Sequence, residues 1–191
     1  MDRRQWNERY ASQPILWAVD PGPFLGGEVG HRPPGRALDL GAGEGRTALW
    51  LAERGWQVTA VDFSDVGLDK GRQRAEELGV GADVEWVCAD LLDFDPTGES
   101  YDLVLLMFIH LPPADRRRLL RRAAATLDPG GMVLVVGYHP TDGSAGDSAP
   151  RMPNRFTPDD IRADLDGLRI DRAERLELPD AVDTIVRAVR D

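Results

Sequence analysis

Short apolar runs alternate with helix-like segments along the chain after residue 35. Short apolar runs bounded by Gly, Asp or Pro are typical of strands that are covered on both faces. Their alternation with helices predicts an α/β fold, in which a mainly parallel sheet carries helices on both faces. Two segments near the C-terminus alternate apolar and polar residues, which predicts a hairpin around Pro179-Asp180. The predicted strands are 36–40, 57–62, 84–88, 101–107, 132–138, 168–178 and 182–189.

Residues with strong capping preferences mark the predicted helix ends. Ser64 and Thr157 are predicted N-caps, because a hydroxyl there can accept a hydrogen bond from a free backbone amide of the first turn. Gly55 is a predicted C-terminal stop, and the run Asp128–Gly131 is predicted to be a turn that ends a helix. The predicted helices are 46–54, 66–78, 112–127 and one that starts at Pro158, with a helix and a loop over 5–29 ahead of the sheet.

The segment 139–154 is the longest stretch without periodicity and is rich in Gly, Ser, Asp and Pro. It is predicted to be either a mobile lid or a slack connection. Neither a repeat nor a separating linker divides the sequence, and 191 residues are an ordinary length for one domain. We therefore expect a single domain over residues 1–191.

The charge balance argues against a nucleic-acid partner. The chain carries 33 acidic and 23 basic side chains, a formal net charge of −10, whereas nucleic-acid binding needs clustered Lys and Arg. The basic run 116–122 is interpreted as the solvated face of a helix, with a docking stripe as the alternative.

The sequence also indicates a compartment. It lacks both an apolar run near the roughly 20 residues of a membrane span and a secretory signal core, so we expect a soluble, cytoplasmic protein. The single cysteine, Cys88, cannot form an internal disulfide and lies in an apolar run. It is interpreted as a buried hydrophobic residue, and an active thiol is the alternative.

The main chemical signal is the segment Asp39–Arg46, in which a predicted strand runs into the glycine-rich turn Gly41-Ala42-Gly43-Glu44-Gly45. Glycines allow a tight turn and let a ligand approach the main chain closely. The dinucleotide fingerprint would need glycine at position 46, where this chain has arginine. Asp39 and Glu44 would repel a pyrophosphate, and they suit a ligand that carries positive charge.

Two further acids follow predicted strands. Asp62 comes 21 residues after Gly41, a spacing at which a carboxylate can accept the two hydroxyls of a ribose; a turn or helix-capping role beside Ser64 is the alternative. Asp90 could accept a hydrogen bond from an adenine amine. Ligands of open parallel sheets bind at the carboxyl ends of the strands, so these acids predict a site for a nucleoside-type ligand.

Together these segments resemble the class I S-adenosylmethionine-dependent methyltransferases over essentially the whole chain. The resemblance implies a Rossmann-like, doubly wound sheet of seven strands in the order 3-2-1-4-5-7-6, with strands 1–6 parallel and strand 7 antiparallel. The aromatic residues of 6–10 and Trp17 resemble the small-molecule branch that includes thiopurine-type and tellurite-resistance-type enzymes. In that branch the segment before the sheet, here 1–34, closes over the cofactor, and 35–191 would form the core. The segments that carry the resemblance are Asp39–Gly45, Asp62, Asp90, Tyr101–Leu106 and Leu127–Gly131.

The resemblance implies roles for individual residues toward the cofactor, S-adenosyl-L-methionine. Asp39 would orient the methionine ammonium group, Asp62 would hold the ribose, and Trp17 would belong to the cover. The remaining cofactor contacts would be Gly41, Ala42 and Gly43 at the methionine end, Phe63, Asp90 and Leu91 around the adenine, and Met107 and Phe108 at the sulfonium.

The expected reaction is an in-line displacement in which an S-, O- or N-nucleophile takes the methyl group, mainly through orientation. His110 is the candidate general base if one is needed, with packing or gating as the alternative. Tyr138 and His139 could face the acceptor, and Arg151 and Arg155 could neutralise an anionic acceptor. The histidines lack metal-ligand spacing, so no metal is expected.

We therefore expect a methyltransferase acting on a small-molecule acceptor, without nucleic-acid or membrane partners, as a monomer or weak homodimer. A noncatalytic cofactor-binding or partner-activating subunit of the same fold is the alternative. A nicotinamide-dependent oxidoreductase is disfavoured by Asp39 and Arg46.

Overall fold

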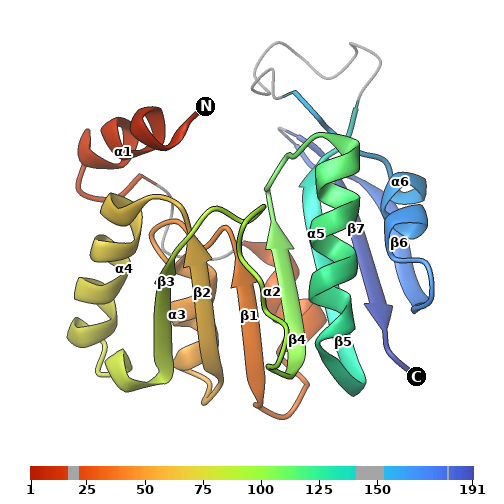
Figure 1. Cartoon of the computed structure of the whole chain (residues 1–191), viewed down its shortest axis with the longest axis horizontal. Coiled ribbons are helices and arrows are strands. Elements are labelled where there is room, and N and C mark those ends of the chain that lie inside the picture. Colours follow the sequence, from red (N-terminus) through yellow and green to blue (C-terminus); the bar gives the residue numbers. More distant parts are fainter. Residues whose placement is uncertain (17–21, 141–152, 180) are drawn as a thin grey trace. The chain divides into compact units, whose positions relative to one another are not determined.

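The computed structural model describes residues 1–16, 22–140, 153–179 and 181–191 (Figure 1). The chain forms two compact units, Met1–Phe94 and Asp95–Asp191. The described strands form one sheet in the order β3-β2-β1-β4-β5-β7-β6, and β7 is antiparallel to both of its neighbours. This confirms the predicted fold. The strands are β1 Arg36–Leu40, β2 Gln57–Asp62, β3 Val84–Cys88, β4 Tyr101–Met107, β5 Leu127–Tyr138, β6 Arg169–Glu177 and β7 Val182–Val189.

In the first unit, β1, β2 and β3 are parallel, and α3 and α4 pack along them. Ser64 is the N-cap of α4, because its Oγ accepts a hydrogen bond from the amide of Gly67 at 3.0 Å. This confirms the predicted cap. Leu38, Leu40 and Leu68 are fully buried in the core of this unit. The helices of the unit are α1 Arg3–Ala11, α2 Pro23–Val29, α3 Arg46–Ala52, α4 Asp65–Glu77 and the short 3-10 helix Gly81–Asp83.

In the second unit, α5 (Pro113–Ala125) and α6 (Pro158–Asp164) pack side by side, and α6 contacts β6 and β7 (Figure 1). Thr157 begins α6 with a capping box, in which its Oγ1 accepts from the amide of Asp160 at 3.2 Å and the Asp160 carboxylate accepts from the amide of Thr157 at 2.8 Å. The predicted hairpin of the last two strands is confirmed, while its residue Asp180 lies outside the described residues.

The predicted turn Asp128–Gly131 lies inside β5, which corrects the expected start of this strand. Tyr101 pairs with Leu127 and Leu103 pairs with Met132, so the residues between form a bulge in β5. The bulge is held because the amide of Gly130 donates to the carbonyl of Arg190 at 2.7 Å. Gly130 has φ +80°, a conformation that glycine adopts without strain, and the strand therefore continues through the turn signal.

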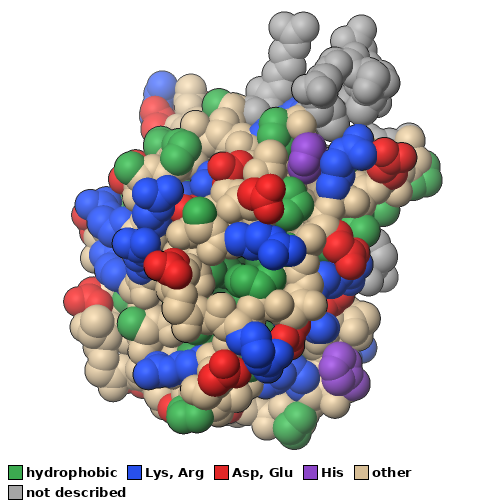
Figure 2. Space-filling model, turned by 90° about the vertical axis from the view of Figure 1, so that its right-hand side faces the viewer, with side chains coloured by type: hydrophobic (Ala, Val, Ile, Leu, Met, Phe, Trp, Pro, Cys, Tyr) green, Lys and Arg blue, Asp and Glu red, His purple; other side chains and the backbone are tan. Residues whose placement is uncertain are grey.

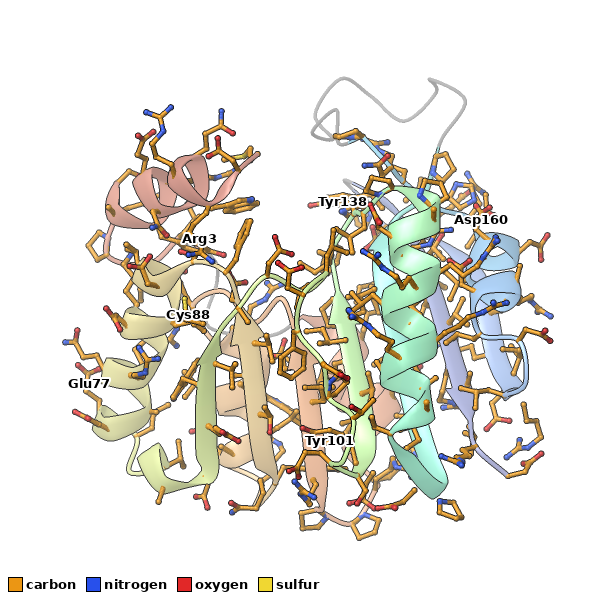
Figure 3. All side chains as sticks on the ribbon, viewed as in Figure 1. Arg3, Glu77, Cys88, Tyr101, Tyr138 and Asp160 are labelled. Carbon is orange, nitrogen blue, oxygen red and sulfur yellow. The ribbon has the colours of Figure 1, made fainter. Side chains whose placement is uncertain are left out.

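Cys88 is exposed, so its interpretation as a buried residue is wrong (Figure 3). The strand that it ends, β3, is at the edge of the sheet, and an edge strand is covered less than a central one. The apolar run indicated the strand correctly, but it could not indicate the position of that strand in the sheet.

Arg116 is buried, so the interpretation of 116–122 as a solvated face is wrong at this position. Its Nε donates to the Asp164 carboxylate at 2.6 Å, and Arg117 donates to the other oxygen of Asp164 at 2.9 Å. Arg118 is exposed and pairs with Asp115. Basic and acidic side chains are mixed over the face that Figure 2 shows. In the described part of the chain, no helix is long and apolar enough to cross a membrane.

Candidate functional site

Asp39, near the end of β1, is a buried carboxylate with an unused oxygen. Its side chain is 1% exposed, and among the described residues its Oδ2 has no hydrogen-bond partner. Burial and the charge of Asp62 together raise the pKa of Asp39 to about 7, although the nearby charge of Arg46 partly opposes this rise. A cationic ligand would supply the missing hydrogen bond and would add a positive charge to that of Arg46.

The glycine-rich turn after β1 makes close contacts within the protein. A Cβ atom on Gly43 would lie 2.4 Å from the hydroxyl oxygen of Tyr10, and one on Gly45 would lie 2.3 Å from the ring of Trp86. Both glycines also have positive φ angles, +55° and +77°. The sequence was interpreted as leaving room for a ligand along the turn, but at these two positions an aromatic side chain uses the space.

Asp62 connects the glycine turn to the start of α4. Its Oδ2 accepts a hydrogen bond from the amide of Gly43 at 2.9 Å, and its Oδ1 accepts from the amide of Ser64 at 2.8 Å. Burial raises the pKa of Asp62, and these amide hydrogen bonds oppose the rise. The alternative turn role is therefore present in the structure. Each carboxylate oxygen can accept a second hydrogen bond, so the arrangement still leaves acceptor capacity for a ligand.

Helix α1 contacts the N-terminal end of α4, close to this turn (Figure 1). Asn7 accepts from the hydroxyl of Ser64 at 2.6 Å and donates to Asp65 at 2.6 Å. Tyr10 is buried with its hydroxyl against Gly43. Neither Asn7 nor Tyr10 was among the predicted site residues; the resemblance of the aromatic segment 6–10 to the small-molecule branch implied only that this part of the chain covers the cofactor.

Glu44 has a positive partner within the chain. Its carboxylate lies 3.1 Å from the ammonium group of Lys70, on α4. The prediction that Glu44 and Asp39 together suit a cationic ligand is therefore corrected for Glu44, because a lysine fills this role. The two residues are 26 positions apart, and no local pattern indicated the pair.

The residues predicted around an adenine follow β2 and β3. The amide of Ala89 donates to the carbonyl of Asp62 at 3.0 Å, and the Cys88 thiol lies 3.7 Å from the carbonyl oxygen of Phe63, so the ends of the two strands are joined. Leu91 is buried. Asp90 is exposed, and its carboxylate accepts a hydrogen bond from the amide of Leu92 at 2.9 Å.

In the second unit, a strained residue follows β4. Phe108 has φ +59°, which is uncommon for a residue other than glycine and is frequent at functional sites. Its amide donates to the carbonyl of Val136 at 2.7 Å, and its ring centroid lies 5.3 Å from that of Tyr138. Met107, just before it, is buried.

His110 belongs to an aromatic stack. Its ring lies 5.2 Å from the ring of Tyr138 and 5.5 Å from that of Phe156, and its Nε2 accepts the amide hydrogen of Tyr138 at 3.0 Å. Burial, together with the charges of Arg155 and Arg116, lowers the pKa of His110 to about 4. With the Nε2 lone pair in use, the geometry favours the packing alternative. The general-base role stays a prediction.

The other candidates for the acceptor region lie near this stack or outside the described residues. Tyr138 ends β5 (Figure 3), and the Arg155 guanidinium lies 5.9 Å from its ring. His139 is joined to β7 by a hydrogen bond from its amide to the carbonyl of Val182 at 2.9 Å. Trp17, Arg151 and most of the 139–154 segment lie outside the described residues.

Asp183, a buried acid on β7, was not among the residues predicted from the sequence. It is 2% exposed, pairs across the strands with Tyr138, and its Oδ1 has no hydrogen-bond partner among the described residues. Burial raises the pKa of Asp183 to about 6. The available signal was a carboxylate within an otherwise apolar strand. Among the described residues, no group of three His, Cys, Asp or Glu side chains could hold a metal ion, and the expectation of no metal stays a prediction.

Parts of the chain are similar in sequence to known methyltransferases. A family described as a methyltransferase domain matches residues 37–131. The tRNA 5-carboxymethoxyuridine methyltransferase of Escherichia coli (strain K12) is 35% identical over 105 residues, covering 54% of this chain and 40% of that protein. Demethylmenaquinone methyltransferase of Clavibacter sepedonicus is 37% identical over 103 residues, covering 54% of this chain and 41% of that protein. This chain thus covers less than half the length of either relative.

Solved structures share the fold. The N-methyltransferase NodS from Bradyrhizobium japonicum WM9, in complex with S-adenosyl-L-homocysteine, has a TM-score of 0.75 at 18% identity, covering 98% of this chain and 97% of that one. A second solved structure concerns the conversion of a disulfide bond into a thioacetal group during echinomycin biosynthesis. It has a TM-score of 0.79 at 23% identity, covering 100% of this chain and 93% of that one. At these identities the likeness establishes the fold.

Proposed function

We propose that this chain is a class I S-adenosylmethionine-dependent methyltransferase, which transfers the methyl group of S-adenosylmethionine to a small-molecule acceptor. The observation that carries the proposal is the unused, buried oxygen of Asp39 beside the glycine turn. In the described part of the first unit, it is the one buried side-chain oxygen or nitrogen without a hydrogen-bond partner.

The first unit fits the donor chemically. The methionine ammonium group would donate to the Oδ2 of Asp39 and would favour the ionised form of this carboxylate. Asp62 would accept hydrogen bonds from the ribose with its remaining lone pairs, while its amide contacts keep the carboxylate fixed. Gly41 and Ala42 would line the methionine end together with Gly43.

The remaining cofactor assignments rest on the family resemblance. Phe63 and Leu91 would contact the adenine, with Asp90 at its edge, where its exposure leaves it open to a ligand. Met107 and Phe108, from the second unit, would contact the sulfonium. Trp17 would belong to the cover of residues 1–34. These assignments, and the description of 1–191 as one methyltransferase domain, are part of the proposal.

Orientation would supply most of the rate. The bound donor provides a methyl group that is already activated by the sulfonium charge, and this chain needs to hold that group in line with the nucleophile in a water-poor site. An acidic acceptor such as a thiol can ionise without help, whereas an alcohol would need a base. The aromatic stack around His110 would then position the acceptor.

The small-molecule acceptor is inferred by elimination and by charge. The relatives named above act, by their names, on a tRNA and on demethylmenaquinone, so the shared segment does not determine the acceptor. The net charge of −10 disfavours a nucleic acid. The expectation of a monomer or weak homodimer stays a prediction.

Calorimetric titration with S-adenosylmethionine, S-adenosylhomocysteine and NAD in parallel tests the proposal. We expect binding of both sulfur compounds and none of NAD. An acceptor screen that monitors release of S-adenosylhomocysteine follows. Binding of NAD alone would contradict the donor assignment, and donor binding without turnover on any acceptor would favour the noncatalytic subunit.

A further inference from the structure

Lys70 is the only lysine in a chain whose other basic side chains, His apart, are all arginine. Its ammonium group has three oxygen partners, namely the carbonyls of Tyr10 and Gln13 and the carboxylate of Glu44, with 2.6 Å to Gln13 and 3.1 Å to Glu44. An ammonium group has three hydrogens on a compact centre, whereas a guanidinium group is a flat fork. The three converging oxygens thus match a lysine better than an arginine.

Glu44 also binds the segment that contains Tyr10 and Gln13. Its side chain is 3% exposed, and both carboxylate oxygens accept from the amide of Leu16, at 3.1 and 3.0 Å. We call residues 10–16 the N-terminal strap. Lys70 binds its carbonyls and Glu44 binds its last described amide, so the ion pair fixes the strap at three points.

The ion pair is poorly solvated, since its side chains are 21% and 3% exposed. Removal of one partner would leave the other charge buried without its opposite, which is costly. Glu44 lies within the glycine turn, between Gly43 and Gly45, and Tyr10 of the strap touches Gly43. The ion pair therefore fixes the strap against the same turn that would line the methionine end of the donor.

We propose that the Lys70–Glu44 pair is a latch that holds the N-terminal strap as a wall of the donor site, so that both are positioning residues for donor binding. The proposal rests on the donor site proposed above. Release of the latch weakens donor affinity and exposes the Lys70 amine, while the sheet stays intact.

The single lysine allows a direct test of the latch without any ligand. Sulfosuccinimidyl acetate can acylate only Lys70 and the amino terminus, and peptide mass spectrometry separates the two. We expect Lys70 of the native protein to react at least about tenfold more slowly than in urea, because its three hydrogen bonds must open first. Glu44→Gln should accelerate the reaction. Equal rates in native and denatured protein would overturn the latch.

A second measurement links the latch to the donor. Calorimetry with S-adenosylhomocysteine should show an affinity at least about tenfold below that of the wild type for both Lys70→Met and Glu44→Gln, because each substitution leaves a buried charge or amide unmatched. Asp69→Asn is the matched control, since it breaks an exposed pair with Arg72 on the same helix and should bind as the wild type does. Circular dichroism checks that each variant is folded. If Lys70→Met is unfolded, Lys70→Arg, which keeps the charge, replaces it in the same titration.

The outcomes separate the two proposals. If the wild type binds S-adenosylhomocysteine and the folded variants bind equally well, the latch proposal is wrong and the donor site stands. If the wild type binds neither donor compound, the proposed function is wrong, and the latch loses its role in donor binding even where Lys70 is protected from acylation.

Discussion

The two units of the protein treat their buried polar groups differently. In the first unit, backbone amides satisfy Asp62, and a lysine and an amide satisfy Glu44, whereas one oxygen of Asp39 has no partner among the residues that the structure describes. In the second unit, His110 is stacked between aromatic rings. Asp183 is buried there, and burial is the cause of its raised pKa. The first arrangement is rigid and suits one defined cation. The second pairs the buried Arg116 with Asp164 but leaves the Nδ1 of His110 and the Oδ1 of Asp183 without a hydrogen-bond partner among the described residues.

The largest effect should come from Gly43→Ala, which tests the rigidity of the first unit. The new Cβ would lie 2.4 Å from the Tyr10 hydroxyl, on a backbone with φ +55°. We expect a loss in unfolding free energy greater than the roughly 1–3 kcal/mol that such a backbone conformation costs alone, and loss of donor binding. Denaturant unfolding and calorimetry measure the two effects. Gly98→Ala is the control, because Gly98 has φ +93° with open space around it; equal losses would mean that Tyr10 contributes nothing.

Asp39 should make donor binding depend on pH. Its pKa lies at about 7 in the free protein, and an ammonium group binds the ionised form. Affinity for S-adenosylhomocysteine should therefore fall as pH drops from 7.5 to about 5.5, approaching tenfold per pH unit at the acidic end. Asp39→Asn should bind more weakly, by about 1.5–3 kcal/mol, and without this dependence. A wild-type affinity that stays constant over this range would disprove the ammonium contact.

Asp183 should make the protein less stable as pH rises, whereas a carboxylate in an ion pair makes a protein more stable as pH rises. Its folded pKa of about 6 lies above the usual 3.8, so the folded state keeps a proton that the unfolded state has lost between these values. The contribution of Asp183 is complete below pH 3.8 and is lost as pH rises through about 6. The free energy of unfolding of Asp183→Asn should thus exceed that of the wild type by on the order of 1 kcal/mol at pH 8, and the two should be equal at pH 3.5. Thermal unfolding across this range checks it; a gain independent of pH would point to packing instead.

The smallest effect should come from His110→Phe, which keeps the stacked ring and removes the acceptor of the Tyr138 amide. We expect a stability loss of about 1 kcal/mol and unchanged donor affinity. The turnover rate on the acceptor found by screening should fall by less than tenfold, whereas loss of a general base costs about 10²–10⁴. A fall in that higher range would restore His110 as the base.

The sequence predicted what local patterns encode. The first four strands coincide with apolar runs, and Ser64 and Thr157 cap helices as expected. The bulge in β5 was missed because Gly130 allows a strand to continue through a turn signal.

The site was predicted where neighbouring residues form it and missed where distant ones meet. The glycine turn and Asp62 were found from spacing. The Lys70–Glu44 pair, the Arg116–Asp164 pair and the stack of His110 with Phe156 join residues 26, 48 and 46 positions apart, and no local pattern records such meetings.

The close packing of Trp86 has a consequence for how related sequences vary. Its ring lies against two glycines, where a Cβ would be 2.3 Å away at Gly45 and 2.5 Å away at Gly71. A side chain at either glycine requires a smaller residue at position 86, and a smaller residue there leaves a void that a side chain at 45 or 71 could fill. Positions 45, 71 and 86 should therefore coevolve as one unit among relatives, and a substitution at one of them is best interpreted together with the other two.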